Sequence, residues 1–352
     1  MIKAKVVGAC GFGGVGIIEL LRQHPKAEVS AIVDIENNGR TMGEVFPHLA
    51  GFCDLPILPP DDPAAQSGYD VVFMATPDRT GMNLAPAEVG QGAKVVDYSG
   101  DFRFNNEEAY ADYAGRIGLD PVHACPELLA RSAYGLPELQ KNSINSKAQI
   151  VGNPGCFAVS STLGLAPAVK GGLISLDGII CDCKTGVSGA GRKPKETFHY
   201  PARYDNMNAY RLSGHQHVCE IERELGTLAG NSVNITFTAQ VVPLCRGIMS
   251  TVYGKLRNDT SPEDAFGVYA EFYKKEPFVR VYNAASQVGT VHVRGTNFCN
   301  LVVSVDERTA QLRVVSYIDN LVKGQAGNAL QNMNILFGLE ETTGLDKPGI
   351  YP

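Results

Sequence analysis

The sequence has 352 residues, of which 44% are hydrophobic, and a formal net charge of −6 at pH 7. This length gives room for two domains, each with its own core. The acidic balance and the lack of Lys and Arg runs exclude a typical nucleic-acid-binding protein. No run of 18 apolar residues indicates a membrane span, and the chain enters a strand pattern at once, without a signal peptide. We therefore expect a cytoplasmic protein with neither a nucleic-acid nor a membrane partner.

Alternating strands and helices characterise the first part of the chain. Apolar patterns predict strands at residues 3–7, 29–33, 70–75 and 93–98, and a helix follows the first strand as far as Leu21. Strand, helix and strand in alternation predict a parallel sheet with helices on both faces. The sequence therefore indicates an α/β domain of the Rossmann type.

A glycine-rich loop joins the first strand to the first helix. Gly8, Gly11 and Gly14 have the spacing G-x-x-G-x-x-G, with Phe12 and Gly13 between the last two. Glycines in this place let the backbone turn tightly and let a pyrophosphate approach the amide groups at the helix start. We expect these five residues to bind a dinucleotide coenzyme.

The coenzyme subtype depends on the end of the second strand, where Asp34 lies 26 residues beyond Gly8. A carboxylate there usually bonds the ribose diol of NAD and repels the 2′-phosphate of NADP. Arg40, a few residues later, could hold that phosphate instead. The residues alone leave both coenzymes open.

From residue 151 onward the pattern changes to a mixture of strands and helices. Strands are predicted at residues 178–183, 233–242, 248–255, 288–294, 300–306 and 312–318, and helices at 217–228, 262–274 and 321–337. The small residues of the closing helix favour close packing against the first domain. We therefore expect a discontinuous dinucleotide-binding domain, residues 1–153 plus 324–352, and an α+β catalytic and oligomerisation domain, residues 154–323.

Cys156 lies in the segment Asn153-Pro154-Gly155-Cys156-Phe157, between a predicted strand at 148–152 and a predicted helix at 157–169. Exposed amide groups and the helix dipole at such a position favour a thiolate, which is a nucleophile. The alternative is a small buried cysteine that only fills space. The other eight cysteines are scattered without a C-x-x-C pair, which indicates buried, inert thiols and no disulfide or zinc framework.

Two histidines, His215 and His217, precede a predicted amphipathic helix. A thiol nucleophile needs a neighbouring base that holds it ionised and later returns a proton, and histidine titrates in the required range. We expect His217 to fill this role and Glu220 to orient it, with His215 as the fallback. The H-x-H-x-C spacing that ends at Cys219 could also indicate metal ligands, but no fourth ligand is obvious and we expect no metal.

A second glycine-rich loop, residues 184–192, follows the strand that ends near Cys183. Its amide groups and Ser188 could line a polar pocket, and Arg192, Lys193 and Lys195 add positive charge suited to an anionic substrate. The alternative is a basic surface loop.

At this point several segments resemble a known family, the N-acetyl-γ-glutamyl-phosphate reductases of arginine biosynthesis, within the wider semialdehyde dehydrogenase group. The matching segments follow the family's order: the glycine loop, residues 44–49, 97–103 and 134–138, the Cys156 motif, and residues 186–192 and 319–324. Two features depart from the family pattern. Val159 and Ser160 stand where Thr followed by Gly, Ala or Cys is common, and Asp34-Ile35 stands where a Ser-Arg pair suits NADP.

The resemblance implies that Cys156 attacks an acyl phosphate, that phosphate leaves, and that NADPH delivers hydride to the thioester, with His217 as acid and base. It places Ser188, Gly189 and Asn332 near the nicotinamide. It also implies that the protein is a homotetramer or homodimer. On the substrate side it implies Asn153 and His215, together with three arginines for phosphate or carboxylate, which are Arg103, Arg192 and Arg246.

Two alternatives stay open beside this interpretation. One is a related reductase for another acyl phosphate, such as carrier-protein-linked aminoadipyl phosphate or aspartyl phosphate. The other is a catalytically silent dinucleotide-binding sensor with the same fold.

Overall fold

The computed structural model describes residues 1–351 and divides the chain into two compact units. The first unit comprises residues 1–112, 120–155 and 325–347, and the second comprises 113–119, 156–324 and the chain from Pro348 on. The expected first domain includes residues 324–352, and residues 325–347 lie in the first unit, but the residues from Pro348 on do not. They belong with the second unit, where the Tyr351 ring stacks on His292 with a centroid distance of 5.7 Å.

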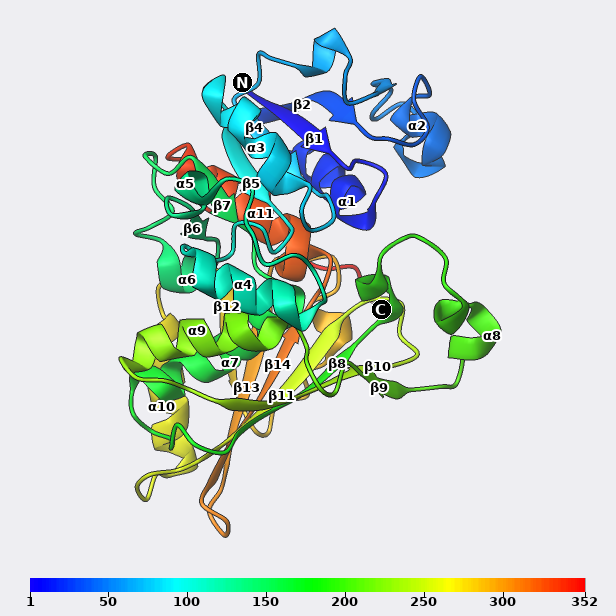
Figure 1. The fold of residues 1–352 in the computed structure, drawn as a ribbon. Coiled ribbons are helices and arrows are strands. Elements are labelled where there is room, and N and C mark those ends of the chain that lie inside the picture. The colour runs from blue at the N-terminus through cyan, green and yellow to red at the C-terminus, as the bar shows by residue number, and fades with distance from the viewer. Residues whose placement is uncertain (352) are drawn as a thin grey trace. The chain divides into compact units, whose positions relative to one another are not determined.

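Seven parallel strands form the sheet of the first unit, in the order β3-β2-β1-β4-β5-β7-β6 (Figure 1). The strands are β1 (Ile2–Val7), β2 (Ala27–Val33), β3 (Ile57–Leu58), β4 (Val71–Met74), β5 (Lys94–Asp97), β6 (Ala133–Tyr134) and β7 (Ile150–Gly152). Parallel neighbours require crossover connections, which helices commonly supply. The helices are α1 (Phe12–Leu21), α2 (Met42–Val45), α3 (Gly81–Gly90), α5 (Pro126–Leu129), α6 (Pro137–Gln140) and α11 (Gly327–Leu336), and α4 (Glu107–Arg116) continues into residues of the second unit. The prediction of a Rossmann-type parallel sheet is confirmed.

The second unit is built on a mixed sheet of seven strands, in the order β12-β13-β14-β11-β8-β10-β9. The strands are β8 (Ile179–Thr185), β9 (Asn208–Tyr210), β10 (Ile235–Val241), β11 (Ile248–Lys255), β12 (Val279–Asn283), β13 (Cys299–Asp306) and β14 (Gln311–Ile318). Two pairs are parallel, β8 with β10 and β12 with β13, and the other four are antiparallel. The prediction of a mixed α+β second domain is confirmed.

Helices pack on one face of this second sheet. They are α7 (Cys156–Lys170), α9 (His217–Ala229) and α10 (Pro262–Tyr273), and a short helix, α8 (Tyr200–Arg203), precedes β9 (Figure 1). Ser160 on α7 donates a hydrogen bond to Ser316 on β14 at 3.0 Å, so even-numbered residues of β14 point toward α7. The neighbouring odd-numbered Val315 therefore points to the opposite face, where it is only partly buried. No helix among residues 1–351 is both long enough and apolar enough to cross a membrane.

The predicted strand at residues 288–294 is wrong. A short 3₁₀ turn, Thr290–His292, occupies this segment, and the edge strand on this side of the sheet is instead β12, Val279–Asn283. The turn forms because His292 Nδ1 accepts a hydrogen bond from the Gly289 amide at 2.9 Å. This local side-chain bond competes with strand pairing.

Candidate active site

Cys156 is the first residue of α7 and is half-buried, as a reactive thiol must be. Strand β7 ends at Gly152, and the intervening residues 153–155 turn the chain directly into the helix. The remainder of the helix, residues 157–169, is buried, which fixes its N-terminus firmly. The amide groups of the first turn and the helix dipole stabilise negative charge on the Cys156 sulfur.

A pocket of about 320 Å³ opens in front of Cys156 within the second unit. Its walls come from α7, the end of β8, the glycine loop after β8, and the segment that leads into α9. The volume lies in the range of small-molecule sites. Of the residues predicted for the site, Cys156, Gly189, His215 and His217 line this pocket together.

His215 and His217 lie side by side, with ring centroids 4.8 Å apart, and both rings contact the edge of Phe157. The His217 amide donates a hydrogen bond to His215 Nδ1 at 3.2 Å, which places the His215 ring proton on Nε2. Burial, and secondarily the positive charge of Arg211, lowers the pKa of His215 to about 4. His215 is therefore neutral at physiological pH.

Lys195, one of the cations expected to suit an anionic substrate, lines the pocket. Tyr210 and Arg211 line it as well, although the sequence analysis assigned these two residues no role. Burial, and then the negative charge of the Cys156 thiolate, raises the pKa of Tyr210, which remains a phenol. Arg211 has a left-handed backbone with a φ of 49° and donates a hydrogen bond to Gln216. Strained residues of this kind cluster at functional sites. The only sequence signal for Arg211 was a basic residue placed four positions before His215.

Other predicted residues of the second unit lie outside this lining. Glu220 is fully buried on α9, one turn after His217. Ser188 is buried beside the lining residue Gly189, and its hydroxyl accepts a hydrogen bond from Asn320 at 3.0 Å. Arg192 is exposed at the end of the same loop.

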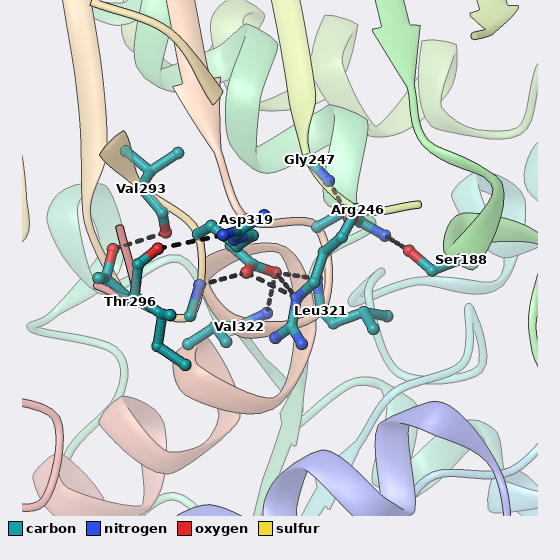
Figure 2. Close-up of polar contacts among 12 residues, drawn as sticks. Ser188, Arg246, Gly247, Val293, Thr296, Asp319, Leu321 and Val322 are labelled. Carbon is teal, nitrogen blue, oxygen red and sulfur yellow. Dashed lines mark hydrogen bonds and ion pairs between the residues drawn. The ribbon is translucent and has the colours of Figure 1, made fainter. Parts of the chain in front are cut away.

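Arg246 forms an ion pair at the carboxyl end of β14. Its Nε donates to both carboxylate oxygens of the fully buried Asp319, at 2.8 and 2.7 Å (Figure 2). The segment after Asp319 reaches Cys156, because a Cβ added to Gly324 would lie 2.7 Å from the Cβ of Cys156. Only glycine fits at position 324 without displacing Cys156.

In the first unit, Arg103 and Asn153 belong to one buried network. Arg103 donates from Nε to the Asn153 carbonyl at 2.8 Å and from Nη2 to the Tyr98 carbonyl at 2.7 Å. Asn332 on α11 donates to the Gly135 carbonyl at 2.9 Å and to Asn153 Oδ1 at 3.3 Å. The network fixes the backbone three residues before Cys156, a task the sequence analysis did not foresee for these side chains.

The predicted coenzyme loop follows β1 at the carboxyl edge of the parallel sheet. Val7 is in register with Val33 and with Met74, so the residues after β1, β2 and β4 meet at this edge. Gly8 has a φ of 78°, and a Cβ there would collide with the Ala75 carbonyl. Helix α1 starts after Gly11 without a side-chain cap, so the amide groups of its first turn are available to an anion. This arrangement fits the pyrophosphate of a dinucleotide.

Asp34 and Arg40 lie beside this loop. The Asp34 carboxylate accepts hydrogen bonds from the Cys10 amide at 2.8 Å and the Glu36 amide at 3.0 Å. Arg40 is exposed and donates to Asn37 Oδ1 at 3.3 Å and to the Glu44 carbonyl at 3.0 Å. Asp34 is therefore bonded directly to the glycine loop, whereas the hydrogen bonds of Arg40 stay within the segment that follows the second strand.

Comparison with known proteins identifies the family. Residues 3–147 match the semialdehyde dehydrogenase, NAD binding domain family, and residues 156–320 match the semialdehyde dehydrogenase, dimerisation domain family. Similar solved structures include aspartate semialdehyde dehydrogenase II complexed with ASA from Vibrio cholerae, with a TM-score of 0.72, 17% identity and coverage of 96% of this chain and 98% of that chain. Aspartate semialdehyde dehydrogenase with NADP from Candida albicans has a TM-score of 0.70 at 16% identity, with the same coverage. At these identities the likeness shows the fold alone.

Sequence relatives are much closer. The N-acetyl-gamma-glutamyl-phosphate reductases of Geobacter metallireducens and Citrifermentans bemidjiense are 44% and 41% identical to this chain over 353 residues, with both chains covered completely. That of Thermoanaerobacter sp. is 41% identical over 354 residues, again with complete coverage. The chain belongs to the N-acetyl-gamma-glutamyl-phosphate reductase family, within the semialdehyde dehydrogenases.

Proposed function

We propose that this chain reduces N-acetyl-γ-glutamyl phosphate to N-acetylglutamate semialdehyde and inorganic phosphate, through a thioester on Cys156, as a step of arginine biosynthesis. The observation that carries the proposal is the half-buried Cys156 at the start of α7, facing a pocket that His217 also lines. A nucleophile at a helix N-terminus with a histidine in reach is the arrangement that acyl transfer requires.

The reaction has two stages in which residues of the chain act: formation of the thioester and, after reduction, release of the semialdehyde. Cys156 Sγ attacks the acyl carbon, the bond from that carbon to the phosphate oxygen breaks, and phosphate leaves with the electron pair. After reduction, His217 donates a proton to the oxyanion of the thiohemiacetal. The C–S bond then breaks, the carbonyl forms, and His217 recovers the proton as the thiolate returns. Glu220, buried one turn away on α9, is the candidate for orienting His217.

The pocket is suited to an anionic substrate. Lys195 and Arg211 both line it, and none of the described residues that line it is acidic. In N-acetyl-γ-glutamyl phosphate, three carbons separate the α-carboxylate from the reacting carbonyl. We assign the α-carboxylate to Arg211 and Lys195, on the side of the pocket formed by β9 and the loop after β8.

NADP is the coenzyme that we propose, held by the glycine loop and the N-terminus of α1. When bound, the coenzyme supplies the hydride that reduces the thioester carbon. Asp34 opposes a 2′-phosphate, but backbone amides already bond both of its oxygens, and Arg40 lies nearby with its positive charge exposed. Replacing Arg40 with Ala should lower the ratio of kcat/KM for NADP to that for NAD by about tenfold, a loss typical of one charge-assisted contact.

Turnover in the reverse direction tests the function. N-acetylglutamate semialdehyde, phosphate and NADP should give NADPH, and aspartate semialdehyde or the aminoadipyl analogue should give little. Absence of turnover with the acetylated substrate would contradict the assignment. Cys156→Ser should bind coenzyme normally and form no acyl-enzyme, and full turnover by this variant would exclude the covalent route.

We further propose that the chain is a homo-oligomer built on the second sheet. Residues 156–320 match a dimerisation domain family, and the sheet face opposite α7 carries partly buried apolar side chains. These side chains are Met249, Val302, Val315 and Tyr317.

A further inference from the structure

Asp319 is a buried carboxylate with an unusually complete set of donors. It accepts from Arg246 Nε at both oxygens, from the Gly295 amide at 2.6 Å, and from the Leu321 and Val322 amides at 2.9 and 3.1 Å (Figure 2). The side chain of Asp319 is 0% exposed. A buried charge satisfied in this way is held rigidly, and it fixes every group that donates to it.

Arg246 uses only part of its guanidinium in this ion pair. Asp319 engages Nε alone, and within residues 1–351 neither Nη1 nor Nη2 has a protein hydrogen-bond partner. The Arg246 side chain is 30% exposed. A guanidinium is a planar fork that can bind two anions along different edges. Asp319 therefore orients Arg246 and leaves its outer edge available to a second anion.

The backbone of Arg246 underlies the wall of the nucleophile's pocket. The Val187 and Ser188 amides donate to the carbonyls of Leu244 and Cys245 at 2.8 and 3.0 Å. Gly186, which lines the pocket, passes so close that an added Cβ would lie 2.8 Å from the Arg246 amide nitrogen. The backbone of Arg246 therefore packs behind the wall formed by residues 186–188, while Arg246 itself does not line the pocket.

The same aspartate is tied to the nucleophile through its backbone. The Gly324 amide donates to the Asp319 carbonyl at 2.9 Å, and Gly324 is the residue that touches Cys156. The adjacent Asn320 accepts from the Gly247 amide at 2.7 Å and donates to Ser188 at 3.0 Å. The segment 319–324 thus connects Arg246, the pocket wall at Ser188 and Cys156.

We propose that Asp319 is a positioning residue that holds Arg246 as the phosphate-binding cation of this site. The inference rests on the proposed acyl phosphate reaction. In an acyl phosphate, a single oxygen separates phosphorus from the carbon that Sγ attacks, so the leaving group stays close to the thiol. The bond that breaks leaves its electron pair on that oxygen, and a fixed guanidinium stabilises the added negative charge.

Protection of Cys156 from alkylation by iodoacetamide tests the proposal with inorganic phosphate as the probe. Cys245 is exposed, so the experiment uses a Cys245→Ser background and follows the Cys156 adduct by mass spectrometry at constant ionic strength. In Arg246→Ala and in Asp319→Asn, the phosphate concentration that protects Cys156 should rise by about tenfold or more. The double variant should need no more phosphate than Arg246→Ala alone, because both substitutions remove the same interaction. Arg308→Ala, at a side chain 83% exposed, is the matched control and should match the parent.

Steady-state kinetics of Arg246→Ala and Asp319→Asn in the reverse reaction should show a raised KM for phosphate and an unchanged KM for NADP. The proposal would be overturned if Asp319→Asn is protected by phosphate to within about twofold of the parent. It would also be overturned if the loss of protection in the double variant equals the product of the losses in the two single variants. If Asp319→Asn does not fold, Asp319→Glu keeps the charge and must show an intermediate loss of protection. Because protection needs no organic substrate, it reports on Arg246 even if turnover with N-acetylglutamate semialdehyde fails.

Discussion

The two histidines of the pocket are two positions apart in sequence but have different chemical states. His215, with a pKa of about 4, is neutral near pH 7, and its Nδ1 is engaged by the His217 amide. A neutral imidazole cannot donate a proton as an imidazolium does. His215 therefore fits the role of a support for His217 rather than the acid itself.

Replacing His217 with Asn should lower kcat by about 10²- to 10⁴-fold, because general acid–base catalysis is lost. Replacing His215 with Asn should lower kcat much less, since only the support of the His217 amide is changed. The kcat of both variants, measured between pH 6 and 9 with the parent as the reference, checks this order. A larger loss of kcat in His215→Asn than in His217→Asn would make His215 the acid and base instead of His217.

At the residue scale, prediction from the sequence followed local motifs. Cys156 and the glycine loop stand at strand-to-helix junctions, and such junctions are visible in the order of residues. Arg103 and Arg246 could be identified only as cations. Sequence cannot show that Arg103 bonds two backbone carbonyls or that Asp319 clamps Arg246, because these contacts join segments far apart in the chain.

At the scale of elements, the substitution Gly324→Ala tests how closely the segment after β14 packs against Cys156. Gly324→Ala places a Cβ 2.7 Å from the Cβ of Cys156, so one of the two backbones must shift. Overpacking of this kind should cost about 1–3 kcal/mol of stability, and displacement of the thiol should lower kcat by about 10²-fold. Urea denaturation and turnover measure the two effects.

Gly267→Ala in the interior of α10 is the matched control, because no atom lies within 4 Å of its added Cβ. It should raise stability by about 0.5–1 kcal/mol and leave turnover unchanged. If Gly324→Ala and Gly267→Ala changed stability and turnover equally, Gly324 would not be the residue that holds Cys156 in place.

Asp97, at the end of β5, makes stability depend on pH. Burial, and then the neighbouring Asp101 carboxylate, raises the pKa of Asp97 well above its ordinary value. Its stabilising contribution is complete below the unfolded pKa of about 3.9 and is lost as pH rises through the folded pKa. Asp97→Asn should therefore gain stability relative to the parent as pH rises, by about 1–2 kcal/mol at pH 8.

Urea denaturation at pH 4.5 and pH 8 measures that gain, with the exposed Asp259→Asn as control. A difference between Asp97→Asn and the parent that does not change with pH would contradict the expected titration. Asp97 also accepts a hydrogen bond from the Asn153 amide through its carbonyl, which the substitution leaves intact.

Among the elements, the long periodic ones were the most predictable. The error at residues 288–294 arose because Val291 and Val293 alternate with polar residues as in a strand, whereas β12 is short and partly exposed. The closing helix was predicted as one piece, but a π-helical turn at Val322–Ala326 precedes α11. That turn follows from the bonds to Asp319, which the helical periodicity does not reveal.

At the scale of the whole molecule, the fold class, the enzyme class and the family are confirmed. The order of strands and helices carries this information, because parallel and mixed sheets differ in the spacing of their strands. The chain from Pro348 on groups with the second unit through contacts of Gly349 and Tyr351 with residues 292–296, and contacts between segments so far apart in sequence are not visible in a residue pattern.

The proposed oligomer gives a prediction at this scale. Val315 pairs with Val302 on the sheet face opposite α7, and both are partly buried. Val315→Glu should place a charge in a buried interface and shift the molar mass, measured by light scattering, toward that of one chain. Arg308→Glu, at a side chain 83% exposed in the turn before β14, is the control. A single-chain mass for the parent itself would contradict the interface.

Strand β9 gives the pocket an unusual outer boundary. It is an edge strand of three residues, paired only with β10, and it carries Tyr210 immediately before the strained Arg211. Short edge strands have low local stability and open without unfolding the rest of the sheet. Amide hydrogens of residues 208–211 should therefore exchange with solvent faster than those of β8, and slow down when the substrate occupies the pocket. The pocket would then admit its ligand by brief fraying of one sheet edge.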